Sequence, residues 1–597
     1  LRTMRDGRGR PARRSLRWSA VVAAAALWLG AVRAGDAAAP AGNSAAPATT
    51  ESTAGAADRP VRLFLAGPAP AETLIVLDLS AFPPDLARMF VSLQGIVNQG
   101  RPRLYLLTGG FDRMWAEWLV TRGDTHRLVV REPVQAFELI REFRSELQGQ
   151  VVIDPALPAT INVATMLSGL DRLLITHPRF AALYAERYHL PIVVDLRGRF
   201  RSSAEAYRWA WEELWPRLNH HALAILHPDI SHLRDVLIQQ KIFVWWQSGL
   251  VDGREPGNNM MPELEVTHAI LRGAPVNIPV LGYPWHGDGV GLGEGPGVTL
   301  FSRYGKFLIP TDWAANLSVH SRARPPAGPL NPPPSPAGAA ATLDETKAYI
   351  SLIVSDGDNL QAWLNYFPRY WQARGTVPVG WTIGPAALDL MPDVIDYLRQ
   401  HRTDGDYFLA AVSGIGYAYL DHYGEALADP DGALDGFFSL TASYMERLGL
   451  NMIWPMVSGG PVPRPLLVRY AEGIPFLSAL FPDYGQKVPS YRAAHSLLQI
   501  GGRRVAVFHA LGSGQARTGA ELQRLLAAAP RPAFAHAFVL NWNHPDTAEL
   551  ARAVAAVGDD AVALRPDALV ALYTAWAAGP DAPAESEAAA EGDAPPG

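Results

Sequence analysis

The sequence predicts an α/β fold in which an N-terminal α/β region with a mostly parallel sheet precedes a (β/α)8-like barrel or a distorted seven-unit barrel. Two observations lead to this prediction. Short, continuously apolar segments alternate with amphipathic segments, which is typical of buried parallel strands joined by helices. About eight such units follow one another in about 235 residues of the C-terminal region, which matches the size of a (β/α)8 barrel. An open doubly wound sheet is the alternative.

In the N-terminal region, residues 60–322, short apolar segments are predicted as buried strands. These segments are Thr73–Leu79, Arg103–Leu107, Val151–Asp154, Leu173–Ile175, Ile192–Leu196, Leu223–Leu226 and Ile242–Trp246. Amphipathic segments between them, such as Pro84–Val97 and Ala204–Trp215, are predicted as helices. No glycine-rich phosphate loop opens these helices, so nucleotide binding is not supported.

In the C-terminal region, residues 343–578, strands and helices alternate more regularly. The predicted strands are Ala348–Asp356, Val377–Gly384, Tyr407–Ser413, Met452–Val457, Pro475–Asp483, Arg504–Leu511, Phe534–Asn541 and Ala561–Leu564. The predicted helices include Leu360–Ala373, Pro385–Gln400, Gly432–Leu448, Thr518–Ala529 and Thr547–Val557. This rhythm is the basis of the barrel prediction.

The first 34 residues have the order of a secretion signal. Seven arginines are followed by the apolar run Ala20–Leu29 and by small residues ending at Ala34. The apolar run is about half the length of a membrane-spanning helix, which needs about 20 residues. We therefore predict a signal peptide over residues 1–34, a secreted or periplasmic protein, and no integral membrane span after the signal is removed.

Three further segments lack a packing pattern. Residues 35–59 are rich in Ala, Gly, Ser, Thr and Pro and are predicted to form a disordered tether. Residues 323–342 are proline-rich and predict a linker or a long surface loop. Residues 579–597 predict a disordered acidic tail.

Composition narrows the chemistry. The chain has no cysteine, which excludes thiol nucleophiles and thiolate metal sites. Its net charge is −6 and no basic block follows the leader, which argues against a nucleic-acid partner. Its 17 Trp and 19 Tyr could supply aromatic surfaces for sugar rings, although most such side chains belong to a core. Composition does not indicate the oligomeric state.

Candidate site residues follow the predicted strands at their carboxyl ends, where the active sites of barrels lie. The candidate catalytic residues are Asp356, Asp358 and Asp483. The candidate substrate-binding residues are Asn359, Gln361, Tyr417, Tyr419, His509, Asn541, Trp542 and His544, with Asp312 and Trp313 from the N-terminal region. We expect Asp356, Tyr417, Asp483 and Trp542 to line one cleft. Carboxylates, amides and aromatic rings on one rim suit the hydroxyl groups and apolar faces of sugars.

Asp356 and Asp358 carry the strongest chemical signal. Two residues apart at the end of a strand, their side chains should point to the same side. Neighbouring carboxylates raise the pKa of one of them, as a general acid requires. The pair could also hold a divalent cation, although no cofactor is predicted. The alternative is that Asp358 or Asn359 caps the helix that begins near Leu360.

Several separated motifs resemble one family. Gly414-Ile415-Gly416-Tyr417-Ala418-Tyr419-Leu420 resembles the motif of the GxGYxYP family of putative glycoside hydrolases, with Leu420 in place of the final proline. The resemblance covers most of residues 65–578. It also includes Ser355–Asn359, Asn541-Trp542, Leu93–Asn98, Tyr304-Gly305-Lys306 and Asp312-Trp313. It implies a hydrolase that acts on carbohydrate.

The leading hypothesis is an enzyme, an exported glycoside hydrolase that cleaves a poly- or oligosaccharide by carboxylate acid/base catalysis. One alternative is a metal-dependent carbohydrate deacetylase that binds its cation through Asp356 or Asp358 with His509 or His544. Another is a glycan-binding protein without catalytic activity, in which the acidic residues only cap helices. In each case the expected partner is a carbohydrate.

Overall fold

The computed structural model describes residues 62–332, 342–371, 374–482, 494–510, 522–524, 526–527, 529–539 and 547–579. The predicted leader and tether lie outside these residues, as do residues 333–341 of the proline-rich stretch and most of the acidic tail. None of the helices within the described ranges has the length and apolarity needed to cross a membrane.

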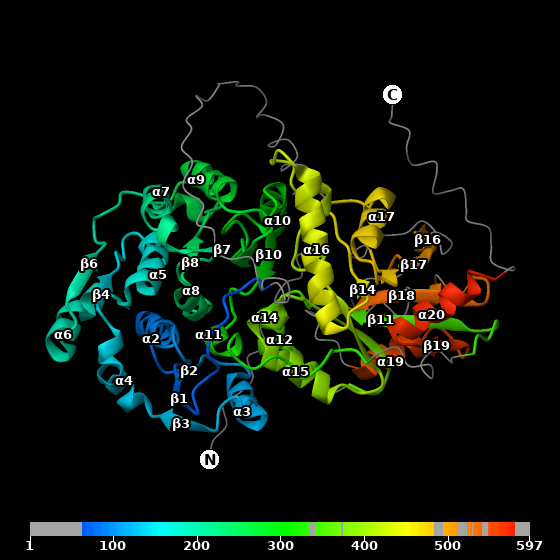
Figure 1. Ribbon diagram of the computed structural model, residues 1–597, viewed down its shortest axis with the longest axis horizontal. Helices are drawn as coiled ribbons and strands as arrows, with labels where there is room; N and C mark the ends of the chain where they lie inside the picture. Colours follow the sequence, from blue (N-terminus) through cyan, green and yellow to red (C-terminus); the bar gives the residue numbers. More distant parts are fainter. Residues whose placement is uncertain are drawn as a thin grey trace, which may run out of the picture. The chain divides into compact units, whose positions relative to one another are not determined.

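The N-terminal region contains three separate sheets (Figure 1). The first has the order β2-β1-β3, the second β5-β4-β6 and the third β10-β9-β7-β8. Their strands are β1 (Thr73–Asp78), β2 (Leu104–Leu107), β3 (Arg127–Arg131), β4 (Gly149–Val152), β5 (Leu173–Thr176), β6 (Ile192–Asp195), β7 (Asn219–Ile225), β8 (Ile242–Trp245), β9 (Pro279–Gly282) and β10 (Phe307–Pro310). The pairings within these sheets are parallel, which confirms the predicted α/β class with parallel sheets.

The helices of this region follow the strands. They are α2 (Pro84–Val97), α3 (Asp112–Arg122), α4 (Glu138–Glu142), α5 (Ala159–Asp171), α6 (Pro178–Tyr188), α7 (Ser203–Glu213), α8 (Arg234–Gln240), α9 (Met260–Gly273), α10 (Glu294–Arg303) and α11 (Leu317–His320). Helix α2 has the predicted bounds, with Pro84 at its first position, where a proline loses no hydrogen bond.

The Leu93–Asn98 motif forms a buried amide network. The Gln94 side chain donates to Asn316 Oδ1 at 2.7 Å, and the Asn98 side chain donates to Ser318 Oγ at 2.9 Å. Both amides also donate to the carbonyl of Leu104 in β2. The motif therefore joins α2 to β2 and to the segment around α11, because buried amides need such partners.

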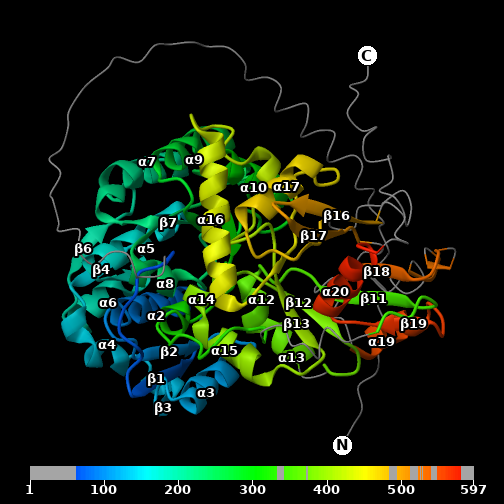
Figure 2. The ribbon, with the colours of Figure 1, turned by 45° about the vertical axis from the view of Figure 1, so that its right-hand side comes forward.

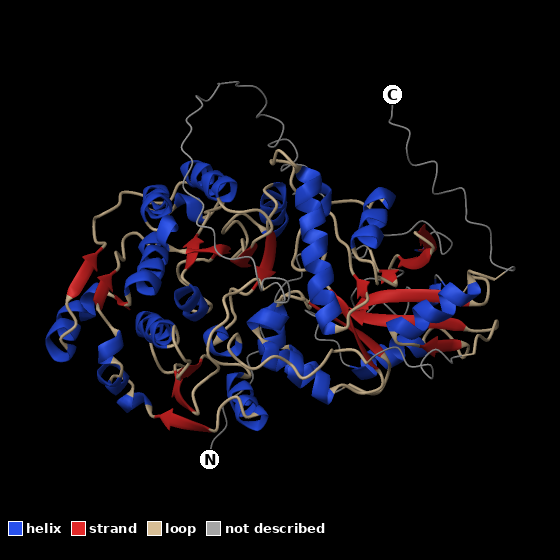
Figure 3. Cartoon of the chain, viewed as in Figure 1, coloured by secondary structure: helices blue, strands red, loops and turns tan. Residues whose placement is uncertain are grey.

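The C-terminal region is built on one nine-stranded sheet (Figure 3). Its strand order is β16-β17-β15-β14-β13-β12-β11-β18, and β19 also pairs with β11. The strands are β11 (Ala348–Val354), β12 (Val379–Ile383), β13 (Asp406–Ala410), β14 (Met452–Ile453), β15 (Ala479–Leu480), β16 (His495–Ile500), β17 (Arg503–Phe508), β18 (Ala533–Val539) and β19 (Ala561–Ala563). The sheet is parallel except for the antiparallel pair β16–β17.

This sheet curls like half a barrel. Strand β19 pairs with the first half of β11 and β12 with its second half, so these two strands diverge along the same side of β11. Helix α20 (Pro566–Trp576) packs on β11 and β17. Within the described residues, no strand pairing closes the sheet between β16 and β18, so a complete barrel is not observed.

Each of the eight predicted C-terminal strands corresponds to an observed strand, but most are shorter. β11 ends at Val354 and not at Asp356, because the chain turns sharply there. Strand β16 was not predicted. It forms a hairpin with β17 through Gly501-Gly502, whose φ angles of 54° and 79° suit a tight two-residue turn.

The C-terminal helices also follow the predicted rhythm (Figure 2). They are α12 (Leu360–Asn365), α13 (Phe367–Trp371), α14 (Ala387–Leu390), α15 (Pro392–His401), α16 (Pro430–Leu448), α17 (Arg464–Gly473), α19 (Thr547–Ala555) and α20 (Pro566–Trp576). Two predicted helices are divided, Leu360–Ala373 into α12 and α13 and Pro385–Gln400 into α14 and α15. Most of the predicted helix Thr518–Ala529 lies outside the described residues.

A buried ion pair joins α11 of the N-terminal region to α15. The Nδ1 atom of His320 lies 2.8 Å from Asp393 Oδ2, and both side chains are almost fully buried. Burial alone would lower the pKa of His320. The negative charges of Asp393, Asp112 and Asp235 outweigh burial, so the pKa is raised. The charged pair therefore stabilises the contact between the two regions.

We expect this contact to weaken as the pH rises. A histidine whose pKa is raised by folding contributes stability that is complete below its unfolded pKa of about 6.5 and is lost as the pH passes the folded value. Replacing His320 with Gln should cost about 3–5 kcal/mol in mildly acidic buffer, because Asp393 is left buried without its partner. The cost should be smaller at alkaline pH. Urea unfolding at several pH values measures it, and an equal cost at every pH would contradict the charged pair.

Candidate active site

The turn after β11 brings two carboxylates together. Asp356 adopts a left-handed conformation with φ of 61°, which is rare for a residue with a side chain and is concentrated at functional sites. Its Oδ2 atom accepts a hydrogen bond from Ser355 Oγ at 2.5 Å. Because β11 ends before this turn, strand alternation does not orient Asp356 and Asp358. The turn nevertheless keeps the two carboxyl groups within electrostatic range.

Gly357 fixes the turn against β12. Its amide donates to Thr382 Oγ1 at 2.9 Å, and its carbonyl accepts from the amide of Gly384 at 2.9 Å. A Cβ atom at this position would lie 1.7 Å from the carbonyl oxygen of Thr382. Only glycine fits here, so the position of both aspartates depends on this contact.

Asp358 is the buried acid of the site. Its exposed fraction is 6%, and its pKa is raised well above the ordinary value. The causes are burial first, then the negative charge of Asp356, and then that of Glu294. The alternative that Asn359 serves as a helix cap is not observed. Asn359 is the N-cap residue of α12, but its side chain makes no capping hydrogen bond. In the described part of the chain, Asn359 Oδ1 is buried without a hydrogen-bond partner.

The Gly414–Leu420 loop pairs with β10 of the third N-terminal sheet. Leu308 and Tyr417 exchange two backbone hydrogen bonds, each of 2.8 Å. A Cβ atom on Gly416 would lie 2.6 Å from the ring of Phe307. The motif glycine is therefore required by the close approach of the loop to this strand.

The tyrosines of this loop point to a carboxylate that the sequence analysis did not single out. Tyr417 Oη donates to Glu294 Oε1 at 3.1 Å and lies 2.9 Å from Tyr419 Oη. Both phenol rings are buried, whereas Glu294 is exposed at the first turn of α10. The two tyrosines thus form a buried wall with Glu294 at its open side.

Tyr283 lies among the acidic side chains. Burial raises its pKa most strongly, followed by the charge of Glu294, a hydrogen bond to Glu294, and the charges of Asp358 and Asp312. A single phenol therefore has three carboxyl groups around it. Two of them, on Glu294 and Asp312, come from the N-terminal region and the third from the C-terminal region.

Asp312 and Trp313 lie against α12. Gln361 Oε1 accepts a hydrogen bond from the amide of Trp313, and Asn365 donates to the Trp313 carbonyl at 3.1 Å. Burial raises the pKa of Asp312 to about 7, and its Oδ1 atom has no hydrogen-bond partner among the described residues. The Trp313 ring is 42% exposed and stacks on His286 at 6.1 Å. These side chains form the second edge of the site.

Two parallel sheets thus present their carboxyl ends to one place. Tyr283 follows β9 and Asp312 follows β10, while Asp358 follows β11 and the Tyr417 loop follows β13. The carboxyl ends of parallel strands are where ligands bind in such sheets. We call this group the carboxylate cluster, and it consists of Tyr283, Glu294, Asp312, Asp356, Asp358, Asn359, Gln361, Tyr417 and Tyr419.

The other predicted site residues are not part of the cluster as described. Asp483, Asn541, Trp542 and His544 lie outside the described residues. His509 follows β17, where its amide donates to the Ala494 carbonyl. Burial lowers the pKa values of the nearby His495 and His536, and the neighbouring His509 adds to this effect. Within the described ranges, no three metal-binding side chains gather in the way that a metal ion requires.

Glu294 and Tyr283 were missed or left open for different reasons. Tyr283 lies in the loop Gly282–Asp288 after β9, and a loop sequence does not show which distant side chains it contacts. Glu294 lies within the glycine-dense stretch 287–297, which has no periodic pattern. The available signal was an acidic residue in the first turn of the helix that begins inside this stretch, and its meaning depends on a contact with Tyr417, 123 positions away.

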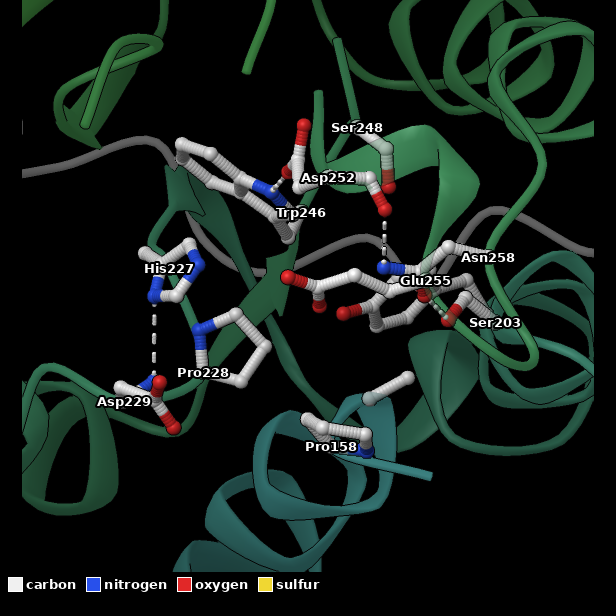
Figure 4. A pocket seen from close by; sticks show the side chains of 12 residues that line it. Pro158, Ser203, His227, Pro228, Asp229, Trp246, Ser248, Asp252, Glu255 and Asn258 are labelled. Carbon is white, nitrogen blue, oxygen red and sulfur yellow. Dashed lines mark hydrogen bonds between the residues drawn. The ribbon is translucent and has the colours of Figure 1, made fainter. Parts of the chain in front are cut away.

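A separate hollow lies between the second and third N-terminal sheets. Figure 4 shows Trp246, His227 and Pro228 on one side, with Glu255, Asn258 and Pro158 around them. No member of the carboxylate cluster lines this hollow. The rings nevertheless connect the two places, because His227 stacks on His286 at 4.3 Å and His286 stacks on Trp313.

Comparison with known protein families shows which family the chain belongs to. Four consecutive family models match it, described as the GxGYxYP_N 1st domain (residues 73–145), the GxGYxYP_N second domain (147–218), the GxGYxYP third domain (220–322) and the GxGYxYP putative glycoside hydrolase C-terminal domain (346–574). The chain belongs to the GxGYxYP family, as the sequence motifs predicted.

A solved structure shares the fold. The crystal structure of a putative hydrolase from Bacteroides thetaiotaomicron VPI-5482 matches with a TM-score of 0.72 at 20% sequence identity. The match covers 86% of this chain and 97% of that one. A search of curated proteins gave no match. At this identity the likeness establishes the architecture alone.

Proposed function

We propose that the protein is an exported glycoside hydrolase that cleaves a poly- or oligosaccharide by acid/base catalysis at the carboxylate cluster. The observation that carries this proposal is the buried Asp358 in the turn beside Asp356, because burial and the neighbouring negative charge raise its pKa and so favour the protonated form that a general acid needs. Glycoside hydrolysis needs such an acid to protonate the departing oxygen, together with a second carboxylate. The family description and the hydrolase neighbour support the same class of reaction.

The surroundings of Asp358 suit a sugar. The amides of Asn359 and Gln361 can pair with hydroxyl groups, and Trp313 offers an apolar ring edge. The apolar leader supports export, and the carbohydrate would then be extracellular or periplasmic.

A panel of oligosaccharides of different sugars and linkages tests this function. The full chain should release reducing ends from at least one member, and treatment with a chelator should leave the rate unchanged. Inactivity on every glycan would contradict the proposal. Loss of activity with the chelator, restored by a transition metal, would favour a deacetylase-type metal site instead.

We expect the negative charge of Asp356 to set the pH range in which Asp358 can act as the acid. Its negative charge helps to raise the pKa of Asp358, so replacing Asp356 with Asn should lower that pKa. Activity that needs protonated Asp358 falls as the pH rises through this pKa, and the fall should therefore move to lower pH in the variant. The pH dependence of kcat/KM measures the shift. An unchanged alkaline limb would show that Asp356 does not act on the acid.

A further inference from the structure

We propose that Glu294, contributed by the third N-terminal domain, is the catalytic base that works with Asp358, and that Tyr417 and Tyr419 position it. This inference rests on the proposed function and extends it. It assigns the second carboxylate of the reaction to a residue outside the C-terminal domain. It also gives the tyrosines of the family motif a defined task.

The first argument is the environment of the two carboxyl groups. Asp358 is buried to an exposed fraction of 6%, whereas Glu294 is exposed to solvent. Burial favours the neutral form of a carboxyl group, as a general acid requires. Two carboxyl groups with opposite environments form the acid and base pair that glycoside hydrolysis requires.

The second argument is how firmly Glu294 is placed. It accepts hydrogen bonds from Tyr417 Oη and from Tyr283, and Tyr419 lies behind Tyr417 at 2.9 Å. Tyr417 is itself fixed by two backbone hydrogen bonds to Leu308. A surface glutamate without a function does not need two phenol partners, one of them held by a strand of its own domain.

The third argument is the presence of unpaired polar atoms in the same cluster. Asp312 and Asn359 are 4% and 8% exposed, and each has a side-chain oxygen with no hydrogen-bond partner among the described residues. Buried oxygen atoms are normally paired, so an unpaired one is costly unless a ligand or water supplies the donor. Sugar hydroxyl groups are donors of this kind.

The reaction then balances with one water molecule. Asp358 gives its proton to the glycosidic oxygen as the bond from that oxygen to the anomeric carbon breaks. A water molecule, which can reach the exposed Glu294, forms the new bond to the anomeric carbon. Glu294 takes the proton that this water loses. The product sugar therefore has the inverted anomeric configuration.

The test uses the full chain and substitutes each carboxylate in turn. On a glycan cleaved by the wild type, Glu294→Gln should lower kcat by about 10²–10⁴-fold, as expected for loss of a general base. Glu265→Gln, on an exposed glutamate of α9, is the matched control and should match the wild type. Tyr417→Phe should lower kcat with little change in KM, because it only displaces Glu294.

Two readouts separate a base from a structural residue. Proton NMR of the first product should show inversion at the anomeric carbon, and retention would overturn the assignment. With an aryl glycoside, added azide should restore turnover to Glu294→Ala and yield the inverted glycosyl azide, because azide attacks without a base. If azide did not restore turnover to Glu294→Ala, the assignment of Glu294 as the base would also be overturned.

The two proposals can fail separately. If no glycan is cleaved, the proposed function fails, and the role of Glu294 fails with it. If the wild type is active and Asp358→Asn is not, but Glu294→Gln is as active as the wild type, only the role of Glu294 is overturned.

Discussion

Replacing Asp358 with Asn should abolish cleavage of natural glycans while sparing activated substrates. A natural leaving group needs a proton, and loss of the general acid should lower kcat/KM by about 10²–10⁴-fold. An aryl glycoside with an acidic phenol leaves without that proton, so its rate should change by much less. The dependence of the rate on the leaving-group pKa in wild type and variant measures the effect. Asparagine preserves the shape of the buried side chain.

A useful control is Asp344→Asn, which changes an exposed aspartate of the same region. This substitution should leave the rates of cleavage of both the natural glycan and the aryl glycoside unchanged. Equal losses on natural and activated substrates in Asp358→Asn would mean that this residue is not the acid. The cluster would then need another proton donor, and Asp312, with a pKa raised by burial to about 7, would be the next candidate.

The second large effect should come from Gly357→Ala. The added Cβ atom would lie 1.7 Å from the Thr382 carbonyl oxygen, so the turn or β12 must move. We expect a loss of about 3 kcal/mol or more in the free energy of unfolding, at the upper end of the usual cost of overpacking. Thermal and urea unfolding measure it. Activity should fall as well, because Asp356 and Asp358 flank the glycine.

Gly459→Ala provides the matched control. No heavy atom lies within 4 Å of a Cβ atom at that position, and its backbone does not require glycine. Its stability should match that of the wild type to within about 0.5 kcal/mol. If Gly357→Ala were equally harmless, the close contact with Thr382 would not be a constraint on the fold.

Many of the strands and helices could be predicted because a buried segment has a recognisable pattern of apolar residues in its own sequence. A strand such as β11, covered on both faces, is a continuous apolar run, and α2 has a proline at its start. β9 and β10 were not predicted because proline or glycine stands at their ends and leaves only two or three apolar residues in a row, and β3 was not predicted because arginine stands at both of its ends. The division of the N-terminal strands into three sheets depends on pairing between distant segments, which no local pattern encodes.

The candidate site could be proposed from sequence where its residues stand close together after a single strand. Asp356 and Asp358 could be selected because two carboxylates close to a strand end are unusual. Glu294 could not, because its neighbours in the sequence are mostly small and its partners are distant. The shortening of β11 also shows that side-chain direction cannot be extrapolated past a left-handed residue such as Asp356.

The contact between Gly416 and Phe307 has a consequence for how these proteins diverge. The GxGYxYP signature lies in the C-terminal domain, but the space that its second glycine leaves is filled by a ring from the third domain. The backbone carbonyl oxygen of Leu308 also lies 2.8 Å from a Cβ atom at 416, so a smaller side chain at 307 alone would not make room for a larger residue. Position 416 should therefore remain glycine wherever relatives keep this contact between the two domains. Exchanging single domains between family members should fail unless the third and C-terminal domains are transferred together.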